Sequence, residues 1–305
     1  MHKISGHIHS ERRENRNLLI TVLLNLTISL VELMGGLVSN SLALISDAIH
    51  NFSDGIAVAI TYISLKISKK ESNETNTFGY KRIQILAALF NAVTLIAICI
   101  FLLFEAYQRF MHPEPVKSTA MFVVATIGLI ANIIGVFLLK DFSKGNLNVK
   151  AAYLHLIGDS LSSVAVIVGG VLIYYFDIQW IDPLITVLIS LYIITETWHV
   201  LSETYFILMQ STPKSLDINN IRNEICKIQG VKDLHHVHIW SLTDQQIHFE
   251  GHIELCEDKK ISESQEIYCK IKEILLKSYG IQHITLQPEF NFCDDKHLVS
   301  PNHTC

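Results

Sequence analysis

The chain has 305 residues, of which 50% are hydrophobic and 17% are charged, and its formal net charge is −5. The charged fraction lies well below the soluble average of about 25%, whereas the hydrophobic fraction is ordinary. This composition excludes a disordered chain, a collagen and a coiled-coil rod, and the negative net charge argues against a general nucleic-acid binder. Fifteen histidines are many for this length, and the six cysteines form no CxxC pair.

The first two-thirds of the chain consists of long apolar runs with charges in the short gaps between them. The six runs cover residues 18–38, 41–65, 83–104, 120–139, 151–176 and 181–200. Each has about 20 residues or more, which suffices to cross ~30 Å of hydrocarbon. Six buried core helices of a soluble protein would leave no soluble surface. We therefore predict an α-helical membrane protein with six transmembrane helices over residues 15–203, preceded by a polar leader at residues 1–14.

The basic residues in the gaps predict the orientation. Residues 1–17 and the gaps at residues 66–82 and 140–150 together hold 12 Lys and Arg. The other three gaps, which should lie on the opposite side of the membrane, hold only Arg109 and Lys117. Because Lys and Arg concentrate in cytoplasmic loops, both termini should be cytoplasmic. Cysteines of the C-terminal third then lie in a reducing compartment, which excludes structural disulfides.

The C-terminal third is acidic, with 10 Lys and Arg against 14 Asp and Glu after residue 203, and it predicts a small cytoplasmic α+β domain at residues 204–290. Helical periodicity covers residues 218–228 and 261–279, the second helix ending at Gly280. Alternating segments at 231–242 and 246–255 predict a hairpin, and residues 281–289 predict a last strand. The order αββαβ predicts a three-stranded sheet with helices on one face. Residues 291–305 are expected to be a flexible tail.

Two of the predicted spans carry a histidine and an aspartate four residues apart: His50 with Asp54, and His155 with Asp159. Ionisable groups at the centre of a span cost ~2.5–3.5 kcal/mol each, so they mark functional sites. At this spacing both side chains lie on one helix face, and small residues beside each pair permit close helix packing. Two imidazoles and two carboxylates suit a tetrahedral divalent ion such as Zn²⁺. The alternative is two intrahelical hydrogen bonds, but two identical pairs favour a metal.

Three further carboxylates lie in or near the same apolar runs. Asp47, three residues before His50, is expected to support the ligands by hydrogen bonding or to line the access path rather than to act as a fifth ligand. Glu32 and Glu196 are candidates for pairing with a neighbouring helix.

Several segments resemble the cation diffusion facilitator family, especially its bacterial zinc/cobalt/cadmium efflux branch. They are SLALISDAIHNFSDGIA (41–57), FGYKRIQ (78–84), AAYLHLIGDSLSSVAVIVGG (151–170), Asp182-Pro183, HIW (238–240) and HITLQPE (283–289). The resemblance covers roughly residues 15–290 and implies six spans, a homodimer, a metallochaperone-like cytoplasmic domain, and exchange of a divalent metal for protons. It implies that the transport ligands are His50, Asp54, His155 and Asp159. For regulatory zinc in the cytoplasmic domain it implies His238, His252, His283 and Glu289.

The chemistry of the proposed ligands agrees with a proton-coupled antiporter that exports metal. A neutral histidine binds metal and a protonated one does not, so metal and protons compete for one site. The donor set suits Zn²⁺, with Co²⁺ and Cd²⁺ as further candidates. The same constellation in an intramembrane zinc metalloenzyme is the alternative. Four protein ligands would close the coordination shell that such an enzyme needs open, and no separate general base is present.

Overall fold

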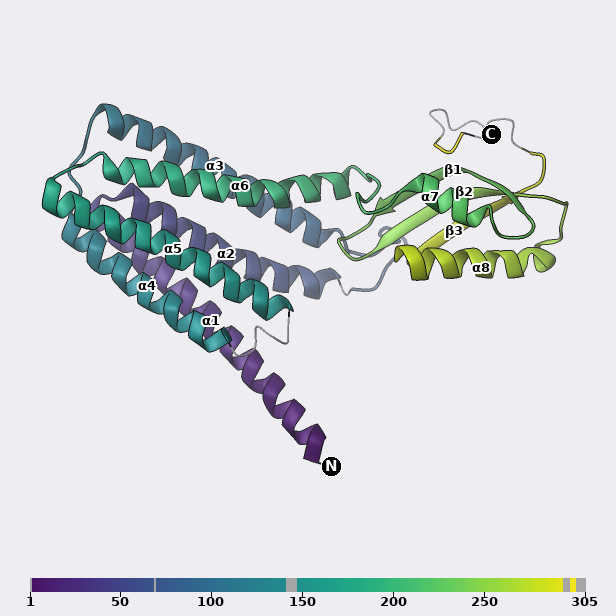
Figure 1. Cartoon of the computed structure of the whole chain (residues 1–305), viewed down its shortest axis with the longest axis horizontal. Helices are drawn as coiled ribbons and strands as arrows, with labels where there is room; N and C mark the ends of the chain where they lie inside the picture. The colour runs from purple at the N-terminus through teal and green to yellow at the C-terminus, as the bar shows by residue number, and fades with distance from the viewer. Residues whose placement is uncertain (1, 69, 141–146, 293–296, 300–305) are drawn as a thin grey trace. The chain divides into compact units, whose positions relative to one another are not determined.

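The computed structural model describes residues 2–68, 70–140, 147–292 and 297–299, without the side chains of residues 2–19, 58, 61, 62, 65 and 147–152. The chain forms two compact units, residues 1–63 with 90–200 and residues 64–89 with 201–305. Figure 1 shows the elements, which are α1 (His2–Ser39), α2 (Leu42–Ser68), α3 (Ile83–Met111), α4 (Ser118–Lys140), α5 (Leu147–Phe176), α6 (Ile181–Leu208), α7 (Ile218–Ile225), β1 (Val231–Ser241), β2 (Ile247–Leu255), α8 (Ile261–Tyr279) and β3 (His283–Glu289).

Five helices of the described part of the chain are long and apolar enough to cross a membrane, namely α1, α3, α4, α5 and α6. The predicted run at residues 41–65 folds as α2 but is not among these five. The described N-terminal half of α2 carries the ionisable residues Asp47, His50 and Asp54. Helix α1 begins at His2, so the segment expected as a separate leader is helical from residue 2 onward.

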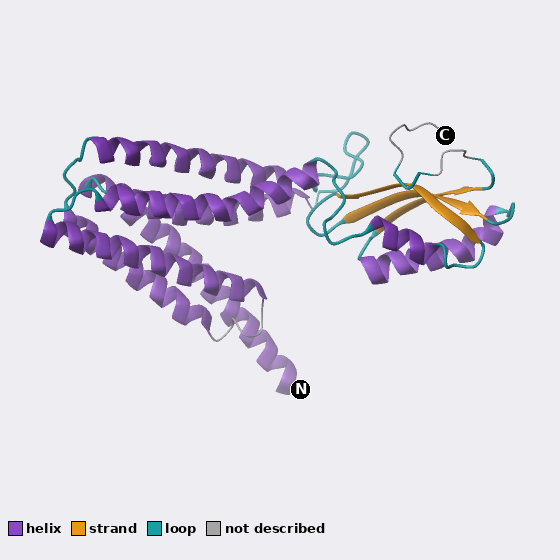
Figure 2. Cartoon of the chain, turned by 45° about the horizontal axis from the view of Figure 1, so that its top comes forward, coloured by secondary structure: helices purple, strands orange, loops and turns teal. Residues whose placement is uncertain are grey.

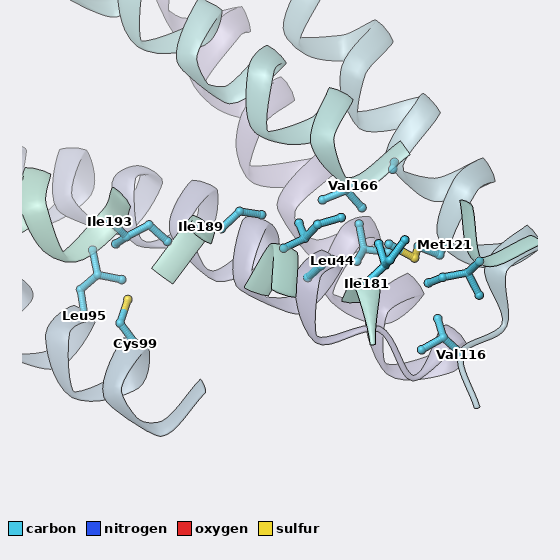
Figure 3. Close-up of a cluster of buried hydrophobic side chains, with 13 residues drawn as sticks. Leu44, Leu95, Cys99, Val116, Met121, Val166, Ile181, Ile189 and Ile193 are labelled. Carbon is cyan, nitrogen blue, oxygen red and sulfur yellow. The ribbon is translucent and has the colours of Figure 1, made fainter. Parts of the chain in front are cut away.

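An apolar core holds the helices of the first unit together. Figure 3 shows Leu44 of α2, Met121 of α4, Val166 of α5 and Ile181 of α6 gathered in this core, where all four are buried. Helix α4 lies against both α1 and α5. These contacts bring α2 and α5, the two helices with His–Asp pairs, into one bundle.

The N-terminus of α2 is fixed by Asp182, near the start of α6. The Asp182 carboxylate accepts hydrogen bonds from the Leu42 amide at 2.8 Å and the Ala43 amide at 3.3 Å, and the Ser41 hydroxyl donates to it as well. The first amides of a helix have no intrahelical acceptor, and a negative charge there is favoured by the helix dipole. Asp182 therefore joins α6 to α2 at one end of the bundle.

The second unit contains a three-stranded sheet in the order β1-β2-β3. Strands β1 and β2 pair antiparallel, and β3 returns parallel to β2 after the crossover helix α8. Helices α7 and α8 cover the same face of the sheet (Figure 2), and their apolar side chains Ile221, Ile271 and Leu275 are buried against Phe249 and Ile253 of β2. This is the predicted αββαβ order.

Local signals explain the ends of these helices and one irregularity in the sheet. Asp217 accepts a hydrogen bond from the Asn219 amide at the start of α7, and Gly280 ends α8 with a φ of +67°. In β1 the register shifts between His235 and His238, and His236 adopts a φ of +50°. Its amide donates to the His297 carbonyl, so residues of the predicted tail pair with β1 here. Residues 293–296 and 300–305 of that tail lie outside the described residues.

Candidate metal sites

The four transport-site candidates come together between α2 and α5. The His155 Nε2 atom lies 3.0 Å from Asp54 Oδ2 and 3.7 Å from Asp159 Oδ2. The His50 Nδ1 atom lies 3.5 Å from Asp54 Oδ2, and its Nε2 lies 3.9 Å from Asp159 Oδ1. The two imidazole rings are nearly perpendicular, with centroids 5.7 Å apart. Each helix thus supplies one imidazole and one carboxylate, as the four-residue spacing predicts.

The burial of these side chains is uneven. Asp159 and His50 are 2% and 9% exposed, whereas Asp54 and His155 are 30% and 41% exposed. One atom each from His50, His155 and Asp159 lies within 4.8 Å of the others, while Asp54 joins the group through its contacts with the two histidines. His50 Nδ1 and Asp159 Oδ2 are buried and make no hydrogen bond within the described residues. Buried polar atoms without partners are costly, and a cation held between the four side chains would satisfy them.

Asp47 lies outside this group of ligand atoms. It is 1% exposed, and its two carboxylate oxygens accept hydrogen bonds from Ser162 and Ser163 of α5, the second at 3.3 Å. These contacts tie α2 to α5 one turn before His50.

A second His–carboxylate cluster lies on the sheet. The Glu289 carboxylate contacts His235 Nε2 at 3.1 Å through one oxygen and His252 Nδ1 at 2.7 Å through the other. His235 and His252 are opposite each other on β1 and β2, and Glu289 ends β3, so three adjacent strands each supply one side chain. All three are 13% exposed or less, and one atom from each lies within 4.8 Å of the others.

His252 and Glu289 belong to the expected regulatory set, whereas the other two expected residues lie elsewhere. His238 is opposite Glu250 in the hairpin, beyond the register shift. His283 packs against His248 of β2, with ring centroids 4.4 Å apart. The residue that sequence reasoning missed is His235. Regular alternation puts His236 and His238 on one face, but the shift makes the neighbours Leu234 and His235 both buried.

Known proteins resemble the chain over nearly its whole length. Residues 18–209 match the cation efflux transmembrane domain, and residues 213–290 match the cytoplasmic domain of cation efflux proteins. The cation efflux system protein CzcD of Alcaligenes sp. strain CT14 is 38% identical over 95% of this chain and 92% of its own. The cadmium, cobalt and zinc/H(+)-K(+) antiporter of Bacillus subtilis is 36% identical over 93% and 92%, and the zinc transporter ZitB of Pectobacterium atrosepticum is 36% identical over 96% and 91%.

Proposed function

Because the chain belongs to the cation efflux family, also called the cation diffusion facilitators, whose members are metal transporters rather than enzymes, we propose that it exports Zn²⁺ in exchange for protons. The proposed transport ligands are His50, Asp54, His155 and Asp159. Co²⁺ and Cd²⁺ are further candidate substrates, and the names of the CzcD, ZitB and Bacillus relatives are consistent with this range of metals.

The convergence of the two His–Asp pairs from α2 and α5 carries this proposal. The two helices offer two imidazoles and two carboxylates, with His155 3.0 Å from an oxygen of the other helix's aspartate. Two ionised carboxylates supply the charge that neutralises a divalent ion, and four ligands complete the tetrahedral shell that Zn²⁺ prefers. A closed shell also argues against the intramembrane metalloenzyme, because catalytic zinc keeps one position open for water.

Competition at one site would couple metal export to proton entry. Zinc bound from the cytoplasm displaces protons from the ligands, and protons arriving from the opposite side displace the zinc. Two conformations that open the site alternately to each side then give exchange rather than leakage. For this cycle we propose that α2 is the sixth membrane span and that the protein lies in a bacterial inner membrane with both termini in the cytoplasm. Asp47 is proposed to hold α2 and α5 together during the cycle.

For the C-terminal domain we propose a regulatory zinc held by His235, His252 and Glu289, and a role in homodimer assembly. The match to the cytoplasmic dimer-type domain of cation efflux proteins supports the dimer. The three side chains meet without rearrangement, and two nitrogen donors with a carboxylate suit Zn²⁺. The C-terminal domain would then report the cytoplasmic metal level to the transmembrane domain.

The proposal is tested in vesicles that contain the purified full chain and a pH-sensitive dye. In the wild type, adding Zn²⁺ should drive protons across the membrane in the direction opposite to the zinc. Asp54→Asn and Asp159→Asn should abolish that movement, because each keeps the side-chain shape but removes a charge. Asp177→Asn, an exposed aspartate between α5 and α6, is the matched control and should behave as wild type. Undiminished exchange in both ligand variants would contradict the assignment of the site.

A further inference from the structure

Glu32 of α1 is a fully buried carboxylate that the proposed metal site does not use. It is 0% exposed. One oxygen, Oε2, accepts a hydrogen bond from the Asn51 side-chain amide at 3.3 Å. The other, Oε1, has no hydrogen-bond partner within the described residues, and no described lysine or arginine forms an ion pair with the group. An unpaired charge buried in this way is costly, so the carboxylate requires a cation or a proton.

Helix α4 is shaped to receive this side chain. A Cβ atom placed on Gly128 would lie 1.8 Å from Glu32 Oε1, so only glycine leaves room for the carboxylate. A Cβ on Gly135, two turns further along α4, would lie 3.3 Å from Thr21 Cγ2 of α1. Asn132 lies between these glycines on the same helix face and is 2% exposed. Its side-chain amide nitrogen also lacks a hydrogen-bond partner among the described residues.

The unpartnered atoms form a series along α1. Thr21, Asn25 and Glu32 recur on one face of that helix, at spacings of four and seven residues. Thr21 Oγ1 and Asn25 Oδ1 are buried and unpaired in the described structure, as is Asn51 Oδ1 of α2. Buried polar atoms in proteins are nearly always hydrogen-bonded, so this series of exceptions calls for additional partners, of which ordered water is the usual one. We call Thr21, Asn25, Asn132, Glu32 and Asn51 the polar file.

The charges that face Glu32 are acidic. Asp47 of α2 and Asp159 of α5 both repel a negative charge on Glu32, whereas α4 contributes only uncharged groups at Gly128 and Asn132. Zinc arriving between α2 and α5 would bring two positive charges close to this cluster. Metal binding would therefore favour the ionised carboxylate, and metal release would favour the protonated one.

We propose that Glu32 is a second proton-binding site, separate from the metal ligands, which loses a proton when zinc binds and regains it when zinc leaves. The O–H bond of Glu32 breaks, and the proton passes through water in the polar file toward the Thr21 end of α1. This inference rests on the proposed zinc–proton exchange and adds one proton to it. With the N-terminus in the cytoplasm, that proton is released to the cytoplasmic side. The proton that Glu32 regains when zinc leaves enters from the opposite side, in the conformation that opens the site there.

The test counts protons per zinc with the full chain in vesicles that hold a zinc dye and a pH dye. Glu32→Gln should move one proton fewer per zinc than wild type and should bind zinc within about threefold of wild-type affinity. Glu203→Gln, an exposed glutamate on α6, should change neither value. An unchanged proton count in Glu32→Gln overturns the second site alone. If wild type moves no protons with zinc, the exchange itself fails and this proposal fails with it.

Two further measurements cover other outcomes. An infrared carbonyl band from a protonated carboxylic acid should disappear when zinc binds to wild type and should be missing from Glu32→Gln. If Glu32→Gln does not fold, Thr21→Val is used instead, because it keeps the side-chain shape. It should slow proton movement about tenfold at unchanged zinc affinity, and an unchanged rate would contradict the proposed proton path through the polar file. A Glu32 effect seen only when the buffer contains potassium would instead identify a potassium site and overturn the proton assignment.

Discussion

The described part of the chain carries two His–carboxylate clusters that differ in their scaffolds. The transport-site candidates lie on two helices, and two of the four side chains are 30% or more exposed. The cluster of His235, His252 and Glu289 lies on three hydrogen-bonded strands, with each side chain 13% exposed or less. Helices can shift relative to each other, whereas adjacent strands are held by their backbone hydrogen bonds. We infer that the first arrangement suits binding followed by release, and the second suits retention.

The two clusters also differ in the number of negative charges that their side chains supply, and this difference favours the same division between release and retention. Two histidines with two aspartates carry two negative charges, which neutralise a divalent ion and leave the ligands free to bind protons after it departs. Two histidines with one glutamate carry one negative charge, and Glu289 already contacts both imidazoles. The sheet cluster is therefore preorganised, whereas the proposed transport ligands would exchange one cation for another.

The largest difference should appear when the same residue type is removed from each cluster. His50→Ala should lower zinc-driven proton movement at least about 100-fold, because it removes a proposed ligand of the transported ion. His235→Ala should leave the maximal rate within about threefold and change only its dependence on zinc concentration. Initial rates in vesicles over a range of zinc concentrations measure both. Equal losses in the two variants would contradict the division of roles.

A second test concerns how strongly the sheet cluster holds metal. Glu289→Gln should weaken zinc binding to the C-terminal domain about 10- to 100-fold and lower the unfolding free energy by about 1–3 kcal/mol, because both histidines lose a charged partner. Calorimetric titration and thermal unfolding of the full chain in detergent measure the two effects. His283→Ala is the control, since His283 lies outside the cluster, and a comparable loss of zinc binding in it would argue for the set implied by the family resemblance.

The contrast between the clusters also explains what the sequence could predict. An α-helix has one regular period, so the spacing in HNFSD and HLIGD was enough to predict that His50 and Asp54, and likewise His155 and Asp159, share a face. A strand keeps its period only while its register is unbroken. The shift between His235 and His238, with His236 at a φ of +50°, has no signal in composition, so alternation could not indicate His235.

The helix ends show the same dependence on local signals. Gly280 ends α8 as predicted, and Asp217 caps the start of α7, because capping depends on a few neighbouring residues. The role of Asp182 could not be predicted, because its carboxylate caps α2 from a helix about 140 residues further along the chain. The sequence predicted that the His–Asp pairs at residues 50–54 and 155–159 would face each other, whereas the hydrogen bonds of Asp47 to Ser162 and Ser163 required the fold.

The anchoring of α2 allows a smaller test of the helical scaffold. Asp182→Asn should lower the free energy of unfolding by about 1–2 kcal/mol, because the neutral amide caps the start of α2 less well than a carboxylate. Zinc affinity should fall less than tenfold, since no proposed ligand is touched. Thermal unfolding and zinc titration of the full chain measure both effects. A loss of binding as large as that in His50→Ala would show that Asp182 acts on the site directly.

His248 provides a contrast with both clusters, because it is a buried histidine that no described carboxylate pairs with. It is 1% exposed, stacks on Trp240, and packs against His283 and against Phe78 of the segment between α2 and α3. Neither ring nitrogen has a hydrogen-bond partner within the described residues. Burial lowers the pKa of His248 below its usual 6.5, and the positive charges of His283, Lys81 and Arg82 lower the pKa further.

This lowered pKa predicts the smallest effect, a loss of stability in mild acid. Between the folded and unfolded pKa values the unfolded chain binds more protons, so His248 contributes its full stability above pH 6.5 and loses it as the pH falls through the lowered value. His248→Phe keeps an aromatic ring but cannot titrate, so the thermal midpoint of the full chain should depend less on pH between about 7.5 and 5.5. His297→Gln, at an exposed position, should retain the wild-type pH dependence. If His248→Phe retains it as well, the acid sensitivity comes from the carboxylate-paired histidines, and the contrast between paired and unpaired histidines fails.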